Sequence, residues 1–218
     1  MDIRQIQSRL GVSVDGSLGP ISYAALFRHM GAKEHAPALG RGAAEHFQTF
    51  GLVTGLRIAH WLGQFAHESK GFTDFEEDLS YSTERLCKVW PSRFPSFASA
   101  APYARNPRAL ANKVYGLRMG NVEPDDGWRY RGRGPQLTGR ENYGNAARRT
   151  GLPLLVNPDL AADPDNFVLL ACDYWQSRNC NDAADADNLV LVTKRINGGS
   201  IGLAERRLLV LRAGKVLL

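Results

Sequence analysis

Residues 58–78 of the chain read IAHWLGQFAHESKGFTDFEED, an apolar half followed by an acidic half. Its first half predicts a buried amphipathic helix, because large apolar side chains recur at the i, i+3, i+4, i+7 spacing of one helix face: Ile58, Trp61, Leu62 and Phe65. Glu68 continues that stripe. A carboxylate on a buried stripe is costly to ionise unless the protein uses it, so Glu68 is a candidate functional residue. The alternative is that the stripe ends first and Glu68 is a solvated last-turn residue.

A second carboxylate follows a predicted break in this helix. Gly71 interrupts the helical pattern, and Glu77 comes nine positions after Glu68. One continuous helix would place these two side chains on opposite sides, whereas a turn at Gly71 lets Glu77 return towards Glu68 on a loop. Two carboxylates facing each other across a cleft are what glycoside hydrolysis requires, one protonated and one ionised. Glu76 competes for the second role, and spacing alone does not choose between the neighbours.

The composition indicates a globular protein that prefers anionic partners. Its 218 residues fit one domain of ordinary size, or a domain with a small appendage, and 44% hydrophobic residues are normal for a packed core. The net charge of +5 and the pI near 9.3 favour nucleic acid, an anionic membrane or an acidic cell-wall polymer. The arginines are scattered and form no single block, which disfavours nucleic acid.

The three cysteines predict neither a metal site nor a disulfide. Cys87, Cys172 and Cys180 form no CxxC pair. If residues 166–180 are helical, Cys172 and Cys180 lie roughly 12 Å apart along the axis, too far for a disulfide. Such sparse thiols fit synthesis in a reducing cytoplasm. Residues 1–11 hold no apolar signal core and no stretch is long enough to span a membrane, so we expect another agent to release the protein to the cell wall.

No metal or other cofactor is expected. His60 and His67 are seven positions apart, and no HExxH motif is present. The aspartates within residues 182–187 lack the central glycine and closing glutamate of a calcium loop. Asp187 or Asn188 is better explained as the N-cap of the helix that follows.

The pattern along the chain predicts a mainly α fold. Residues 1–35 form a small helical unit whose second helix has Pro20 in its first turn, and Gly31–Gly42 has the composition of a linker to a main domain at 43–218. Residues 118–135, rich in Gly and Pro, predict a surface loop or short hairpin. Little alternating strand pattern is present. In the main domain, periodicity and helix start and stop signals predict helices at about 43–50, 52–67, from Ser82, from Pro107 to Gly116, and at 139–149, 164–178, 188–196 and 203–213.

Residues 128–143, WRYRGRGPQLTGRENY, form a second candidate region. Its glycines match neither GxGxxG nor a GK[ST] phosphate loop, and its Arg-Gly alternation is too short and too interrupted by proline for an RNA-binding segment. Thr138 and Glu141 have the spacing of a capping box that opens the next helix. Thr138 thereby has a structural explanation, and a hydroxyl at a helix start could also hold a water.

Four motifs in this order resemble glycoside hydrolase family 19, and in particular its phage endolysins and bacterial enzymes: HESKGF, EEDLSYS, YRGRGPQLTGRENYG and RINGG. The resemblance covers about residues 43–216. It implies an all-helical, two-lobed, lysozyme-like fold that hydrolyses β-1,4 bonds next to N-acetylglucosamine by inversion and without a metal. Near the start of the chain, IQSRLGVSVDGSLGPISYAAL resembles a small peptidoglycan-binding repeat, with a helical hairpin that merely packs on the main domain as the alternative.

The family resemblance assigns roles to individual residues. Glu68 is similar to the general acid, Glu77 to the base of the endolysin branch, and Thr138 to the Ser/Thr that holds the attacking water. The resemblance also implies that four residues line or contact the sugar sites: Tyr81, Gln136, Asn142 and Asn197. It implies that Arg206 supports the acidic pair by its charge. Asn197 could instead be a turn residue before two glycines, and Arg206 a solvated helix charge.

The disulfide-forming cysteines and secretory leader of plant chitinases in this family have no counterpart here, which favours the endolysin branch. We therefore expect a monomeric enzyme, without nucleic-acid partner or membrane insertion, that cuts peptidoglycan as a muramidase or glucosaminidase. The alternatives are a chitinase using the same residues on chitin, a non-catalytic wall-binding protein, and a lytic transglycosylase, whose chemistry needs only one acid.

Overall fold

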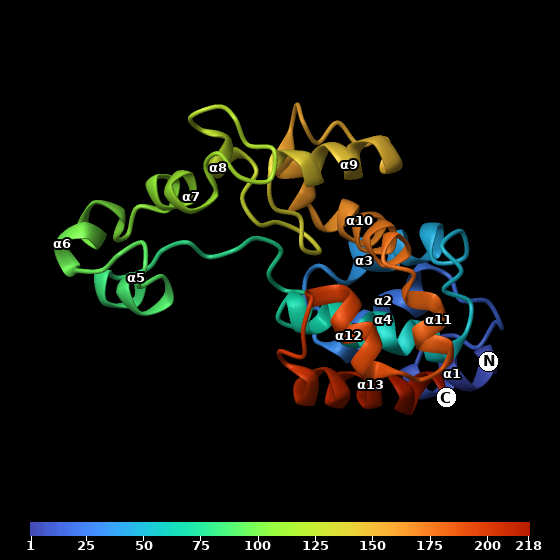
Figure 1. Cartoon of the computed structure of the whole chain (residues 1–218). Helices are drawn as coiled ribbons and strands as arrows, with labels where there is room; N and C mark the ends of the chain where they lie inside the picture. The colour runs from blue at the N-terminus through green and yellow to red at the C-terminus, as the bar shows by residue number, and fades with distance from the viewer. The chain divides into compact units, whose positions relative to one another are not determined.

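The computed structural model describes residues 1–218 and consists of helices joined by loops (Figure 1). Two isolated bridges, Glu76 with Arg133 and Arg133 with Leu137, are its only β pairing. The predicted mainly α fold is confirmed. The helices are α1 (Ile3–Leu10), α2 (Pro20–Met30), α3 (Ala36–His46), α4 (Gly55–Glu68), α5 (Thr83–Val89), α6 (Phe97–Ala100), η1 (Ala101–Tyr103), α7 (Pro107–Tyr115), α8 (Asp126–Arg129), α9 (Arg140–Thr150), η2 (Pro158–Ala161), α10 (Pro164–Ser177), α11 (Cys180–Asp185), α12 (Leu189–Asn197) and α13 (Leu203–Leu217).

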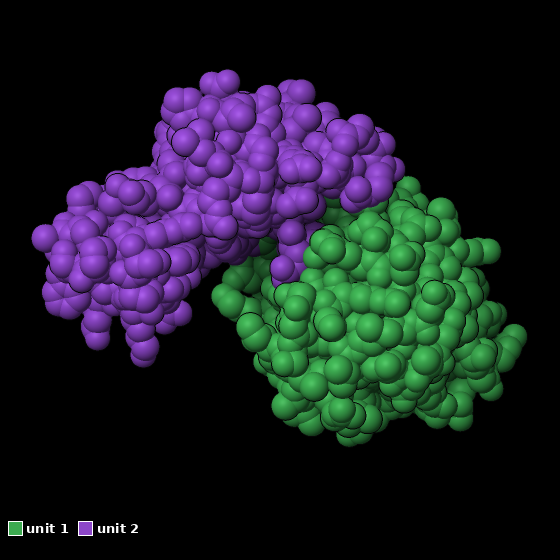
Figure 2. All heavy atoms as spheres, viewed as in Figure 1, with its two compact units in different colours: residues 1–75, 161–218 green, residues 76–160 purple.

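The chain divides into two compact units (Figure 2). Unit 1 comprises residues 1–75 and 161–218, and unit 2 comprises residues 76–160. Each has its own apolar core, around Trp61 and Phe167 in unit 1 and around Leu86 and Leu110 in unit 2. A membrane span would need a longer and more apolar helix than any of those present.

Helix α4 is the central element of unit 1. Thr54 caps it by accepting a hydrogen bond from the Arg57 amide at 3.2 Å. The predicted stripe of Ile58, Trp61, Leu62 and Phe65 is fully buried, and each such side chain contributes roughly 1.5–3 kcal/mol through burial. At Gly63 the helix meets α13 so closely that an added Cβ would lie 2.4 Å from a Val210 methyl carbon. The helix runs from Gly55 to Glu68, so it begins three residues after and ends one residue after the predicted bounds of 52–67.

The predicted linker at Gly31–Gly42 is wrong, because α3 begins inside it at Ala36. Its glycines are helix-packing positions: a Cβ on Gly40 would lie 2.5 Å from the Pro20 carbonyl oxygen, and one on Gly42 2.9 Å from Val168 Cβ. Composition alone cannot distinguish glycines that allow helices to approach from glycines that make a chain flexible. The helix predicted at 43–50 accordingly begins earlier and ends at His46.

The two N-terminal helices form as predicted, with Pro20 at the start of α2. Buried Gln7 fixes the turn between them by donating to Asp15 at 2.7 Å. Ile6 and Phe27 belong to the same core as Trp61, and the Phe27 and Trp61 rings are 6.2 Å apart. Residues 1–35 therefore share a core with the rest of unit 1, and their role in wall binding stays a prediction.

Local signals located α5, α7, α9, α10 and α12, but α6, α8 and α11 were not predicted, and α13 extends to Leu217 beyond the predicted end at 213. Ser82 caps α5, Asn106 caps α7, and α7 ends before Gly116. Asn188, of the two candidates, caps α12 by accepting from the Leu191 amide at 3.0 Å. All three cysteines are free thiols.

Candidate active site

The predicted site residues are distributed over both units. Unit 1 carries Glu68, Asn197 and Arg206, and unit 2 carries Glu77, Tyr81, Gln136, Thr138 and Asn142. Each group is described within its own unit.

Glu68 lies at the end of α4 in an ion pair with Arg206 of α13. The Arg206 side chain is 2% exposed and that of Glu68 15%. Arg206 also donates to Gln64 Oε1 at 2.6 Å and to the Ile201 carbonyl at 3.3 Å. The interpretation of Arg206 as a solvated helix charge is therefore wrong. Breaking such a buried pair by removing one partner is strongly destabilising, because it leaves an uncompensated buried charge.

Gln64 extends this arrangement into the core of unit 1. It lies one helical turn before Glu68, and its Nε2 donates to Thr193 Oγ1 of α12 at 3.0 Å. Both side chains are fully buried. Gln64 is not among the residues predicted from the sequence, although an amide among the apolar residues of a buried helix is a signal that could identify it.

Asn197 organises the loop between α12 and α13. Its Nδ2 donates to the Ile201 carbonyl at 3.0 Å, and its Oδ1 accepts from the Gly199 amide at 2.8 Å. These bonds agree with the turn-residue interpretation, and a contact between Asn197 and sugar stays a prediction. The adjacent loop packs against His67, because an added Cβ on Gly202 would lie 2.4 Å from its ring.

In unit 2, Glu77 is held by neutral donors. Its Oε1 accepts from the Gly132 amide at 2.5 Å, and its Oε2 accepts from the Tyr115 hydroxyl at 2.8 Å. Burial, together with the charge of Glu77 and this hydrogen bond, raises the pKa of Tyr115 well above its usual value, so the phenol remains a donor at neutral pH. Tyr115 comes 38 positions after Glu77, and no spacing signal in the sequence connects the two.

Glu76 has a different environment from its neighbour. Its carboxylate accepts from Arg131 Nε at 2.5 Å and from Arg133 Nε at 3.1 Å. Both arginines are buried, and Arg133 also pairs with Asp159 at 2.5 Å. Both oxygens of the Glu76 carboxylate are therefore engaged by buried guanidinium groups, Oε1 by Arg131 and Oε2 by Arg133. Glu77, whose partners are uncharged, is the better candidate for a base.

The predicted capping box at Thr138 is wrong. Helix α9 begins at Arg140, and its N-cap is Gly139, at φ 87°, with no capping side chain. The amides of Arg140 and Glu141 are bound instead by an upstream loop, through Asn121 Oδ1 at 2.8 Å and the Met119 carbonyl at 3.0 Å. The Thr138 hydroxyl is thus not needed as a cap. The residue Thr138 is half-buried and lies two positions before Arg140, the first residue of α9.

Three further residues of unit 2 were predicted to contact sugar: Gln136, Asn142 and Tyr81. Gln136 is exposed at φ 66° in a tight turn closed by mutual backbone hydrogen bonds of Arg133 and Leu137 at 2.9 and 3.1 Å. Asn142 is exposed on α9 and donates to the Thr138 carbonyl at 2.8 Å. Tyr81 is half-buried, with its ring 5.3 Å from that of Trp90.

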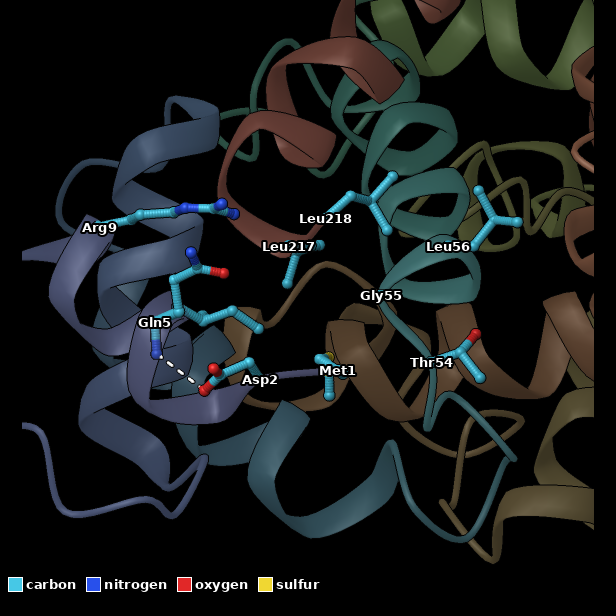
Figure 3. Close-up of a pocket in the computed structure, with 10 residues that line it drawn as sticks. Met1, Asp2, Gln5, Arg9, Thr54, Gly55, Leu56, Leu217 and Leu218 are labelled. Carbon is cyan, nitrogen blue, oxygen red and sulfur yellow. Dashed lines mark hydrogen bonds between the residues drawn. The ribbon is translucent and has the colours of Figure 1, made fainter.

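A pocket of about 390 Å³ lies elsewhere in unit 1, where α1, the start of α4 and the end of α13 meet (Figure 3). Glu68 is at the opposite end of α4, roughly 20 Å along the helix axis from the pocket. None of the predicted site residues lines this pocket. No group of three or more His, Cys, Asp and Glu side chains is placed to hold a metal ion.

Comparison with known proteins identifies the class. No protein-family model matches the chain. A glycosyl hydrolase family 19 domain-containing protein of Haemophilus influenzae is 41% identical over 160 residues, which span 72% of this chain and 78% of that protein. Two endochitinases of Arabidopsis thaliana are each 30% identical over 159 residues, spanning 72% of this chain but only 45% and 44% of their own lengths.

The helical fold and these relatives define the chain as a glycoside hydrolase with a polysaccharide substrate. More particularly, the chain belongs to glycosyl hydrolase family 19, and its mainly α architecture is consistent with the lysozyme-like fold expected from the motifs.

Proposed function

We propose that this protein hydrolyses β-1,4 bonds of bacterial peptidoglycan, with Glu68 as general acid, Glu77 as general base and Thr138 as the residue that positions the attacking water. The observation that carries the assignment of the base is the contrast between two adjacent glutamates. Glu76 is committed to two buried arginines, whereas Glu77 accepts only from an amide and a phenol.

The proposed reaction adds one water across one glycosidic bond. Glu68 transfers its proton to the glycosidic oxygen as the bond to the anomeric carbon breaks. Glu77 removes a proton from the water that attacks that carbon from the opposite face, giving an inverted product. Arg206, buried beside Glu68, holds the carboxyl group in position for this transfer.

Charge favours peptidoglycan over chitin as substrate. The chain carries a formal net charge of +5, and anionic wall polymers attract a cationic enzyme, whereas chitin is uncharged. The peptidoglycan-binding-like pattern of the N-terminal helices, and the endolysin-like motifs, support the same choice.

The test is mass analysis of fragments released from purified peptidoglycan and from chitin by wild type and by Glu68→Gln. We expect disaccharide-peptide fragments with new reducing ends from peptidoglycan, and none from the variant, with unchanged circular dichroism. Full activity of Glu68→Gln would overturn the acid assignment. Anhydro products would instead indicate a lytic transglycosylase, and sedimentation with the wall without any released sugar would indicate a binding protein.

A chitinase is the second candidate function, and the similarity to two plant endochitinases supports it. It uses the same residues on chitin. In the same experiment it predicts chitin oligomers and little or no soluble product from peptidoglycan.

We also propose that the N-terminal helices hold the enzyme on the wall and thereby raise its local concentration there. Deleting them is a poor test, because Ile6 and Phe27 are part of the unit 1 core. Replacing exposed apolar residues is cleaner: Val14 is 44% exposed and Ile21 75%. We expect Val14→Ser with Ile21→Ser to weaken sedimentation with peptidoglycan and to leave the rate on soluble oligosaccharides unchanged. Unchanged sedimentation would contradict this role.

A further inference from the structure

The loop between α7 and α8 contains a buried amide that the proposed mechanism does not yet use. Asn121 is 2% exposed. Its Nδ2 donates to the carbonyl of Tyr115, the last residue of α7, at 2.9 Å, and its Oδ1 accepts from the amide of Arg140, the first residue of α9, at 2.8 Å. The planar side-chain amide offers a donor and an acceptor on one rigid group.

Both ends of this bridge lie next to proposed catalytic groups. At one end, Tyr115 donates its hydroxyl to Glu77 at 2.8 Å. At the other, Arg140 is two residues after Thr138 and begins α9, whose first amides have no side-chain cap of their own. Asn121 thus connects the helix end that holds the base to the helix start that follows the water-positioning residue.

The surrounding backbone shows that this bridge is tightly constrained. Leu117 and Met119 adopt left-handed φ angles of 56° and 52°, which are unfavourable for residues with a side chain. The loop and helix α9 also touch at backbone distance, because an added Cβ on Gly120 would lie 2.8 Å from Glu141 Cβ and one on Gly139 2.3 Å from Met119 Cβ. Such strain persists only where neighbouring contacts hold the segment, and the two bonds of Asn121 are among those contacts.

We propose that Asn121 is a positioning residue that fixes the Tyr115–Glu77 pair relative to the Thr138 segment, and so sets the geometry in which Glu77 meets the attacking water. This inference rests on the proposed function, because it gives Asn121 a role through the proposed base. All the residues involved belong to unit 2.

Asn121→Asp tests the bridge with little change in size. The new carboxylate can still accept from the Arg140 amide at the start of a helix, where negative charge is favourable, but it cannot donate to the Tyr115 carbonyl. We expect kcat to fall by about tenfold or more, because small displacements of reacting groups are costly, while KM changes by less than about twofold. The assay uses chitin hexasaccharide or purified peptidoglycan, whichever the wild type cleaves.

Two controls separate positioning from stability alone. Asn106→Ala removes the N-cap at the far end of α7, where Asn106 accepts from the Ala109 amide at 3.2 Å, and should lower the melting temperature without changing kcat. If Asn121→Asp does not fold, Asn121→Ser provides a smaller, uncharged acceptor for the same measurements.

A double-mutant cycle with Tyr115→Phe decides whether Asn121 acts through Tyr115. We expect the effect of Asn121→Asp on kcat to shrink to less than about threefold when the Tyr115 hydroxyl is already absent. Fully additive effects, or a folded Asn121 variant with wild-type kcat, would overturn the inference. Glu77→Gln is measured alongside: if it is inactive while Asn121→Asp is normal, only the Asn121 role fails, and if Glu77→Gln is fully active, the proposed base itself fails.

Discussion

The two proposed catalytic carboxylates have opposite kinds of partner. Glu68 of unit 1 stands at the end of a helix packed through the core, and it is paired with a buried guanidinium that a buried glutamine supports. Glu77 of unit 2 lies on a loop and accepts from one backbone amide and one phenol. In unit 1 the partner of the carboxylate carries a charge, whereas in unit 2 the charged partners go to the adjacent Glu76. Removing the partner of Glu68 should therefore lower mainly the free energy of unfolding, whereas removing the phenol partner of Glu77 should lower mainly the rate of catalysis.

The largest effect on activity should appear when the same substitution is made at each of the two neighbouring glutamates. Glu77→Gln should lower kcat by about 10²–10⁴-fold, the usual contribution of a general base. Glu76→Gln should retain most of the activity per folded molecule and lose stability instead, because it leaves Arg131 and Arg133 without their shared anion. The measurement is kcat at saturating substrate together with urea unfolding. The reverse pattern would assign the base to Glu76.

Breaking the buried pair in unit 1 should be the largest effect on folding. Arg206→Met leaves Glu68 and Gln64 without their common donor and should lower the free energy of unfolding by about 3–5 kcal/mol. The adjacent Arg207 is exposed on the same helix, so Arg207→Met is a matched control that we expect to change stability by less than about 0.5 kcal/mol. Both are measured by urea denaturation. Equal stability of the two variants would show that the pair contributes little.

Alkaline pH should ionise the phenols of unit 2 before the guanidinium of unit 1 loses its charge, because arginine stays protonated at high pH. Burial raises the pKa of Tyr143 to about 12, and burial and the Glu77 charge raise the pKa of Tyr115 above its ordinary value of 10.0. Above pH 10 the unfolded chain releases these protons while the folded chain retains them, so stability is full below pH 10 and falls as pH rises further.

For Tyr143 this loss amounts to about 2–3 kcal/mol by pH 12, because two pKa units separate the folded and unfolded states. Urea midpoints at pH 9 and pH 11.5 measure it. In Tyr143→Phe the difference between the two midpoints should be smaller than in the wild type, and an unchanged difference would assign the alkaline sensitivity to other groups.

The smallest effect should be that of the phenol itself. Tyr115→Phe removes a single hydrogen bond to Glu77 and should lower kcat/KM by about tenfold, or about 1.4 kcal/mol of transition-state stabilisation. Tyr103→Phe, at a tyrosine of the same unit with no bond to Glu77, is the control. Equal kcat/KM values for Tyr115→Phe and wild type would contradict the role of the phenol.

Local signals predicted much of the fold. Side-chain caps such as Ser82 and Asn106 act within three residues, so α5 and α7 could be located from the sequence. The linker failed as a prediction because Gly40 packs on the α2 backbone, and helix packing leaves no local trace. The capping box failed because Asn121, 19 positions before Arg140, supplies the cap instead.

The site was predictable as a set of residue types but not as a set of contacts. Periodicity placed Glu68 at the end of α4, and the motifs pointed to Glu77. The choice between Glu76 and Glu77 depends on Arg131 and Arg133, which are 55 and 57 positions from Glu76, and on Tyr115. Charge partners so far away in sequence become visible only when the chain has folded.

The three free thiols have a practical consequence for labelling. Burial raises the pKa of Cys180 to about 12 and that of the fully buried Cys172 well above its usual range, which keeps both unreactive towards thiol reagents. Cys87 is half-buried on α5 in unit 2. A maleimide dye should therefore enter the native enzyme at Cys87 first, and wild-type protein can carry a fluorescent reporter in unit 2 without the construction of a cysteine-free background.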